Sequence, residues 1–183
     1  MTHIVCYAGG TAGDLITALI DPTAATFRNG AVIHTKQRQR LKKPHLFADN
    51  AEKDVYIETI SKEFNSIPSH DFAYHRMREH LIISVTVEDM GVALWAAKRF
   101  KELHRPHVWD EMMKVCNAKS VEDYAQILID FSNMIKLYTK QTIKLEGITN
   151  GNLLTDIEQV LGRDLGSTSK EFYQTWYALQ KNL

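Results

Sequence analysis

The chain has 183 residues, with 22 basic and 22 acidic side chains and a hydrophobic fraction of 44%. This composition excludes an intrinsically disordered chain and a small disulfide-stapled protein. The balanced charge excludes a protein that coats nucleic acid and an acidic tail. We therefore expect one globular domain over residues 1–183.

The N-terminal segment and the cysteines favour a cytoplasmic protein. Residues 1–20 lack a basic start, and glycines interrupt their apolar run, so they do not form a signal peptide. The sequence contains no run of about 18 apolar residues, so we expect no membrane span. Cys6 and Cys116 lack CxxC spacing. We expect both to be free, buried thiols in a reducing compartment.

Short apolar segments, each rich in β-prone residues, are predicted to be strands. Leu81–Thr86 gives the strongest signal, because most of its residues are β-branched. His3–Ala8 runs directly into a group of glycines, as a buried strand before a tight loop does. Ala31–Thr35 and Thr142–Leu145 are the other two candidates.

Helices are expected between and after these strands. Apolar residues at helical spacing predict a helix over Ala12–Ile20. Four capping patterns predict further helix starts, namely Asp49/Glu52, Thr86/Asp89, Ser120/Asp123 and Thr168/Glu171. The first three of these helices are expected to end near Phe64, His104 and Lys140, respectively. The helix that starts at Thr86 has an apolar stripe formed by Met90, Leu94, Ala97 and Phe100. The helix that starts at Thr168 is expected to turn Phe172, Trp176 and Leu179 inward. Shorter helices are expected at 107–116 and 151–161.

This alternation predicts an α/β fold with three layers. We expect a mainly parallel sheet of about four to five strands, as in other alternating chains. The first strand, loop and helix would be P-loop-like, and the helix-rich part from about 105 to 183 would form a cap-like region beside the sheet.

The loop after the first strand is the candidate binding site for a phosphate or sulfate group. Glycines permit positive φ and close approach, and a helix N-terminus adds partial positive charge. The cofactor-binding residues we predict are Gly9, Gly10, Thr11, Ala12, Gly13 and Asp14. Asp14 stands where a Walker A motif has lysine, and its carboxylate would compete with an anion. The alternatives for Asp14 are that it caps the helix or binds a sugar or another proton-donating group. The alternative is that the glycines serve only tight packing of strand against helix.

The AGGTAGD stretch resembles a loop of two-domain bacterial cell-wall glycosyltransferases, although this chain has roughly half the length of such a fold. The order of features over residues 3–148 is similar to that of sulfotransferases, and the general style is similar to small phage proteins. The sulfotransferase resemblance implies that 3′-phosphoadenosine-5′-phosphosulfate (PAPS), or another adenine nucleotide, binds the glycine loop.

The same resemblance implies a catalytic base. Sulfotransferases often end a later strand in Thr-His, and here Ser69-His70 stands at that place. His70 would accept the proton of the acceptor hydroxyl, since imidazole titrates near neutral pH. A surface histidine in a turn is the alternative. The chain departs from the family at Thr86 and Leu94, where sulfotransferases carry an arginine for the 3′-phosphate and a serine.

Basic residues are candidates for stabilising the transferred group. The first candidates are Arg76 and two residues of the basic run Lys36–Lys43, namely Lys36 and Arg38. Further candidates that lie near the predicted site in sequence are Arg78, Lys98 and Arg99. A solvated basic face is the alternative for the run. Few aromatic residues interleave with the run, so nucleic acid is not supported as a partner. His70, His75 and His80 are spaced by five, which spreads them around a helix, so no metal site is predicted.

The sequence thus predicts a group-transfer enzyme of sulfotransferase-like fold, which moves a sulfuryl group from a nucleotide donor to a hydroxyl. A kinase-like phosphotransferase acting on a nucleotide or a modified base is the first alternative, and it would need Mg²⁺ and ATP. A non-catalytic binding protein that retains the fold is the second. The expected partner is a small-molecule or nucleotide ligand, with no membrane; a homo-oligomer is left open.

Overall fold

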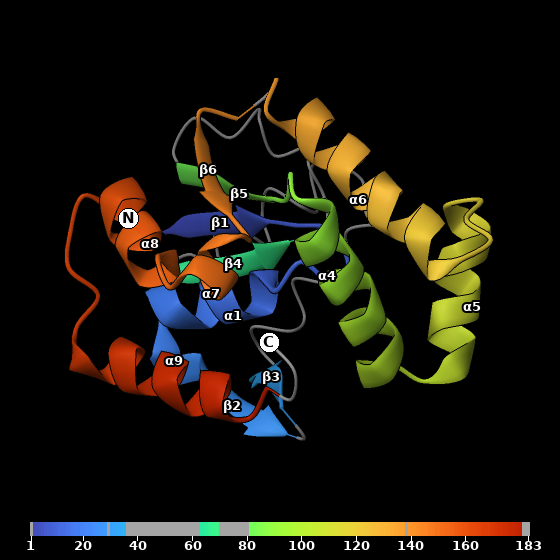
Figure 1. The fold of residues 1–183 in the computed structure, drawn as a ribbon. Coiled ribbons are helices and arrows are strands. Elements are labelled where there is room, and N and C mark those ends of the chain that lie inside the picture. The colour runs from blue at the N-terminus through green and yellow to red at the C-terminus, as the bar shows by residue number, and fades with distance from the viewer. Residues whose placement is uncertain (1, 29, 36–62, 70–80, 138, 181–183) are drawn as a thin grey trace.

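A computed structural model describes residues 2–28, 30–35, 63–69, 81–137 and 139–180 (Figure 1). Its main sheet is parallel and has the strand order β4-β1-β5-β6. These strands are β4 (Ser66–Ser69), β1 (His3–Cys6), β5 (Leu81–Thr86) and β6 (Gln141–Lys144). Every residue of β1 and β4 is buried, as expected of parallel strands that are covered on both faces. The α/β class and the parallel sheet are confirmed, whereas the P-loop-like opening and the three layers stay predictions.

The direction in which strands are added reverses at β1. This strand pairs with β4 on one side, where Ile4 lies opposite Ile67, and with β5 on the other, where Ile4 lies opposite Ile82. In open α/β sheets, ligands bind beyond the carboxyl ends of the strands at such a reversal. The carboxyl end of β1 continues into the glycine-rich loop, so the topology favours that loop as a binding region.

In the view of Figure 1, the helices of residues 90–135 lie to the right of the sheet, and those of residues 13–20 and 153–178 lie below it and to its left. Their bounds are α1 (Gly13–Ile20), α4 (Met90–Leu103), α5 (Pro106–Val115), α6 (Val121–Ile135), α7 (Gly147–Asn150), α8 (Leu153–Leu161) and α9 (Ser167–Ala178). Helix α1 packs on β1 and β4, α6 on β5, α8 on β6 and α9 on α1. The C-terminal helices therefore pack directly on the sheet and on α1.

Three strand assignments differ from the sequence prediction, and the first is Ala25–Arg28, which was not expected to be a strand. Ala31–His34 is a strand, β3, but it pairs antiparallel with β2 (Ala25–Arg28) outside the main sheet. Gly30, with φ of +75°, lies in the turn between them. Strand β4 was not predicted from its residues, since it is short and contains Pro68. Among the described strands β4 lies at the sheet edge, where a missing N–H group is tolerated.

The start of α4 was predicted three residues too early. Thr86 belongs to β5, and the side chain of Asp89 accepts a hydrogen bond from the Val92 N–H, which makes Asp89 the N-cap. Met90 of the predicted apolar stripe is the first residue of α4 and is 40% exposed, whereas Ala97 and Phe100 of the stripe are buried. The expected helix over 49–64 lies outside the described residues except at its end, where Phe64 is not helical.

The later helices match the prediction in place but differ at their ends. Ser120 caps α6 as predicted, by accepting a hydrogen bond from the Asp123 N–H, but α6 ends at Ile135 rather than near Lys140. Helix α9 begins after Gly166 without a side-chain cap, so Thr168 lies inside the helix. Leu179 follows the last turn of α9 and is 48% exposed, not turned inward.

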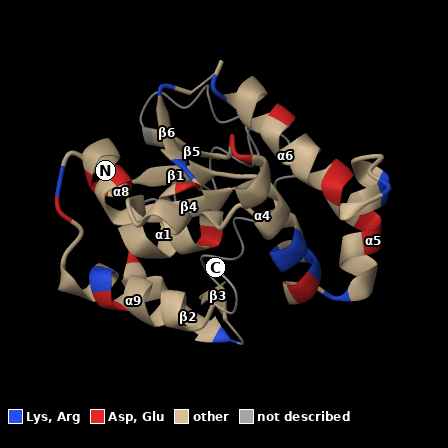
Figure 2. Cartoon of the chain, viewed as in Figure 1, with Lys and Arg blue, Asp and Glu red and all other residues tan. Residues whose placement is uncertain are grey.

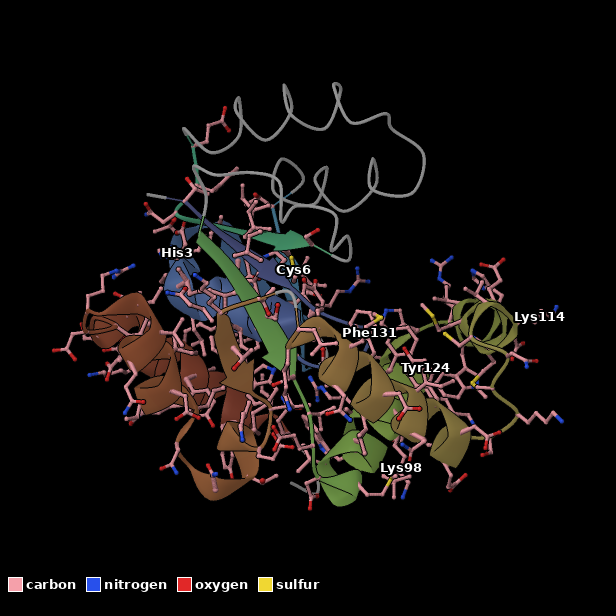
Figure 3. All side chains as sticks on the ribbon, turned by 90° about the horizontal axis from the view of Figure 1, so that it is seen from above. His3, Cys6, Lys98, Lys114, Tyr124 and Phe131 are labelled. Atoms are coloured by element: carbon pink, nitrogen blue, oxygen red, sulfur yellow. The ribbon has the colours of Figure 1, made fainter. Side chains whose placement is uncertain are left out.

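Cys6 and Cys116 are not joined in a disulfide, as predicted. Cys6 is buried in β1 (Figure 3), whereas Cys116 is only half-buried at the end of α5. Burial raises the pKa of the Cys116 thiol. None of the described helices combines the length and the apolar character that crossing a membrane requires.

Ser132 connects α6 to the segment after β5. Its hydroxyl accepts a hydrogen bond from the Val87 N–H at 2.9 Å and donates one to the Leu128 carbonyl oxygen at 2.7 Å, and all three groups are buried. We expect Ser132→Ala to lower the free energy of unfolding by about 1–3 kcal/mol, because the buried Val87 N–H loses its acceptor. Urea denaturation measures this loss, and Ser167→Ala at an exposed position is the control. A loss equal to that of the control would contradict this account.

Candidate functional site

The loop between β1 and α1 has a compact conformation that starts the helix without a side-chain cap. The Thr11 N–H and the Thr11 hydroxyl both donate to the Ala8 carbonyl oxygen, at 3.2 and 2.8 Å. Ala12 has a left-handed conformation with φ of 53°, and the first helical hydrogen bond runs from the Ile16 N–H to the Ala12 carbonyl oxygen. The backbone N–H groups of the first turn therefore have no acceptor within α1.

Each of the three loop glycines also fits a tight contact. A Cβ atom on Gly13 would lie 1.9 Å from Cγ of the Tyr7 ring, and one on Gly10, where φ is +92°, would lie 2.7 Å from the Ala96 carbonyl oxygen. Gly9 lies under the Phe100 ring, and its carbonyl oxygen accepts a hydrogen bond from the Tyr124 hydroxyl at 3.1 Å. The packing role expected of the glycines is thus present, and it holds the loop against α4 and α6.

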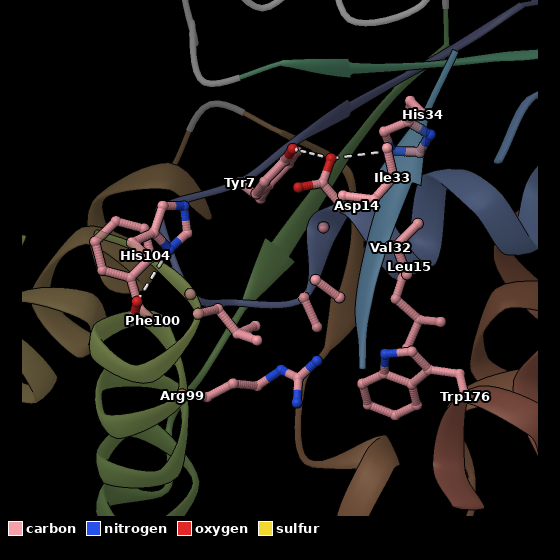
Figure 4. Close-up of a pocket in the computed structure, with 15 residues that line it drawn as sticks. Tyr7, Asp14, Leu15, Val32, Ile33, His34, Arg99, Phe100, His104 and Trp176 are labelled. Carbon is pink, nitrogen blue, oxygen red and sulfur yellow. Dashed lines mark hydrogen bonds and ion pairs between the residues drawn. The ribbon is translucent and has the colours of Figure 1, made fainter. Parts of the chain in front are cut away.

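A cavity of about 260 Å³ opens over this loop (Figure 4). It is bounded by the loop and the start of α1, by β3, by the second half of α4 and by α9. Helix α1 follows β1 and α4 follows β5, so the cavity lies between the helices that leave the two neighbouring strands at the reversal. This is the position where the topology favours a ligand.

The carboxylate of Asp14 lies at one end of the cavity, beside Tyr7 and His34. Oδ1 of Asp14 accepts a hydrogen bond from the Tyr7 hydroxyl at 2.8 Å and lies 2.9 Å from Nε2 of His34. The His34 side chain is 1% exposed, whereas that of Asp14 is 30% exposed. Asp14 is therefore the member of this group that a ligand meets.

A cation lies at the other end of the cavity in the view of Figure 4. The Arg99 guanidinium lies 5.7 Å from the ring centre of Trp95 and 5.2 Å from that of Trp176, and it donates to the Gly30 carbonyl oxygen at 2.8 Å. Burial lowers the pKa of Arg99 to about 10, and the nearby Glu102 opposes this shift. Arg99 is thus charged at neutral pH. Within the described part of the chain, no carboxylate lies within ion-pair distance of it.

Known proteins add no assignment to this geometry. No family model, curated protein or solved structure matches the chain.

The predicted loop residues divide between the cavity and the packing beneath it. Gly10, Ala12, Gly13 and Asp14 line the cavity, whereas Gly9 and Thr11 do not. Among the predicted basic residues, Arg99 lines the cavity and Lys98 is exposed on α4, which carries its basic residues in its second half (Figure 2). The other predicted site residues lie outside the described residues, namely His70, Lys36, Arg38, Arg76 and Arg78.

Several residues that line the cavity were not predicted as site residues, among them Tyr7, His34 and Trp176. His34 lies at the end of a predicted strand, but the rule that sites form at the carboxyl ends of parallel strands does not apply to it, because β3 lies outside the main sheet. The contact between His34 and Asp14 has no local signal in the sequence, because it depends on the hairpin packing against α1. Among the described residues, no three His, Cys, Asp or Glu side chains come together to hold a metal ion.

Proposed function

We propose that the cavity binds the anionic group of a nucleotide donor and that the protein is a group-transfer enzyme of sulfotransferase-like type. The donor would be PAPS or another adenine nucleotide, and the acceptor a hydroxyl. The observation that supports this proposal is Arg99, a partly buried cation that lines the cavity without a carboxylate partner among the described residues.

A buried charge is unfavourable unless it is paired, so the pocket around Arg99 is suited to a ligand that supplies the missing negative charge. Guanidinium groups present several N–H donors in a planar fork that matches phosphate and sulfate oxygens. One of these donors contacts Gly30, and the first turn of α1 adds backbone amides on the same cavity. The volume of about 260 Å³ suits the anionic end of a nucleotide rather than the whole molecule.

In the proposed reaction the acceptor oxygen bonds to sulfur while the bond from sulfur to the donor phosphate oxygen breaks. The nucleotide leaves with the electron pair, and the hydroxyl proton passes to a base. Arg99 would neutralise charge on the transferring or leaving group. The sequence names His70 as the base, a residue outside the described part of the chain.

We expect Arg99→Gln to weaken binding of adenosine 3′,5′-bisphosphate about ten- to hundredfold, as loss of a charged hydrogen-bond donor does. Isothermal titration calorimetry measures this affinity. Lys98→Gln makes the same change of charge one residue away at an exposed position, and it should alter the affinity less than about twofold. Arg99→Lys keeps the positive charge but removes the guanidinium, so comparing it with Arg99→Gln separates the effect of losing the charge from the effect of losing the packing.

The result that overturns the proposal is wild-type protein that binds neither adenosine 3′,5′-bisphosphate nor ATP. Mg²⁺-dependent turnover of ATP would select the phosphotransferase instead. The non-catalytic binding protein would be selected by two results together. The protein would bind the nucleotide without turning it over, and His70→Ala would not change its binding to a protein partner.

A further inference from the structure

Strand β3 borders the cavity with one of its two backbone edges. All of its residues, Ala31–His34, line the cavity, although successive side chains of a strand point to opposite faces. No residue of β2, the strand that pairs with β3, is among the described residues that line it. The cavity therefore runs along the edge of β3 that faces away from β2, and none of the described strands pairs with that edge.

The hydrogen-bond pattern of the hairpin turns the N–H and C=O groups of Val32 toward this edge. The Thr35 N–H donates to the Ala24 carbonyl oxygen at 2.9 Å, so these two residues form a hydrogen-bonded pair. Such pairs alternate along an antiparallel ladder, and Val32 lies opposite Phe27 in a pair of the other kind. The two backbone groups of Val32 bond to none of the described residues, so a ligand strand can pair with them.

Arg99 places a positive charge beside the start of β3. Its guanidinium donates to the carbonyl oxygen of Gly30, the residue directly before the strand, and Figure 4 shows it at the opposite end of the cavity from His34. A strand added antiparallel to β3 ends at this side. Because a strand rises about 3.3 Å per residue, a peptide residue opposite Val32 needs about one further residue to bring a C-terminal carboxylate to Arg99.

We infer that the free edge of β3 binds the C-terminal tail of a partner polypeptide by strand addition, with the terminal carboxylate on Arg99. A guanidinium matches the planar fork of a carboxylate, and strand addition and carboxylate capture are both established modes of peptide recognition. Leu15, Phe100 and Leu103 add apolar walls, which suit a tail that ends in an apolar residue. The cavity of about 260 Å³ would hold only the last residues of the tail.

This tail site goes beyond the proposed function, because it does not require a nucleotide. The tail and the anionic group of the donor would use the same guanidinium, so they would exclude each other. A bound tail would keep the donor out of the cavity, and the partner would therefore inhibit the proposed reaction.

The probe for the carboxylate contact is an acetylated tetrapeptide of three alanines and a C-terminal leucine, and its C-terminal amide is the matched control. By isothermal titration calorimetry we expect the acid to bind at least about tenfold more tightly than the amide, because the amide lacks the charge-assisted hydrogen bond to Arg99. Arg99→Gln should remove most of this preference. Lys98→Gln makes the same change of charge at an exposed position and should keep it.

N-methylation of the acid peptide tests the backbone pairing. A methyl group on the amide nitrogen of the penultimate residue removes the N–H group that pairs with the Val32 carbonyl oxygen, and it should weaken binding at least about fivefold. A methyl group on the amide nitrogen of the terminal leucine should weaken binding less than about twofold, because successive N–H groups of a strand point to opposite edges. This alternation distinguishes strand addition from simple attraction of an anion.

Other results overturn the inference. Equal binding of acid and amide removes the carboxylate contact, and equal binding of the two N-methylated peptides removes the strand addition. If adenosine 3′,5′-bisphosphate binds through Arg99 and the acid peptide does not bind, the tail site falls and the proposed function stands. If the acid peptide binds as expected and neither this nucleotide nor ATP binds, the proposed function falls and the tail site stands. Where both bind, the nucleotide should displace the peptide, and simultaneous binding would contradict a shared Arg99.

Discussion

Replacing Gly13 with alanine is expected to lower the free energy of unfolding by about 3 kcal/mol or more. The added Cβ would lie 1.9 Å from Cγ of the Tyr7 ring, which is 3% exposed and cannot move aside into solvent. Alanine has the better helix propensity, but this offsets at most about 1 kcal/mol. Urea denaturation followed by circular dichroism measures the loss.

Two variants separate this clash from other effects. Gly166→Ala adds a methyl group at a position with no heavy atom within 4 Å, and it should leave the stability nearly unchanged. In a Tyr7→Ala background the ring is absent, so Gly13→Ala should then cost less than about 1 kcal/mol. An equal loss in both backgrounds would show that the Tyr7 ring is not the obstacle.

We expect Trp176→Ala to lower the free energy of unfolding by about 3–5 kcal/mol, the range typical of large-to-small changes at buried aromatic residues. Trp176 is 1% exposed, lies in the helix that packs on α1 and stacks on Tyr173 with 6.1 Å between ring centres. Its ring also lies against the Arg99 guanidinium, so ligand affinity should fall together with stability.

The neighbouring residue provides the matched control. Tyr177 lies on the same helix and is 44% exposed, and its replacement by alanine should cost at most about 1 kcal/mol. Thermal denaturation compares the two variants directly. Equal losses would mean that α9 is held by its exposed side and not by the contact of Trp176 with the core.

The parts of the fold that could be predicted are those specified by local sequence. Leu81–Thr86 has both β propensity and a buried apolar pattern, and β5 has those bounds. Ser120 and Asp123 form a local hydrogen bond that marks the start of α6 wherever the helix packs. Strand β4 lacks such information, because Pro68 argues against a strand and only pairing with β1 reveals its edge position.

The candidate site was predictable only in part, since its chemistry depends on contacts between distant segments. The loop and Asp14 were named from the position of the glycines after a strand. Arg99 was named only as one of several basic residues, because nothing local distinguishes it from the exposed Lys98. Its contacts with Gly30 and Trp176 come from the hairpin and from α9, which are far away in sequence.

The contacts of the Arg99 guanidinium with the Trp95 and Trp176 rings give the protein an intrinsic optical reporter. Indole emission responds to the local electric field, and both rings face the one guanidinium that we propose to bind the ligand. An anion arriving at Arg99 changes that field at two of the three tryptophans of the chain at once. Occupancy of the cavity can therefore be followed by fluorescence in the unlabelled protein.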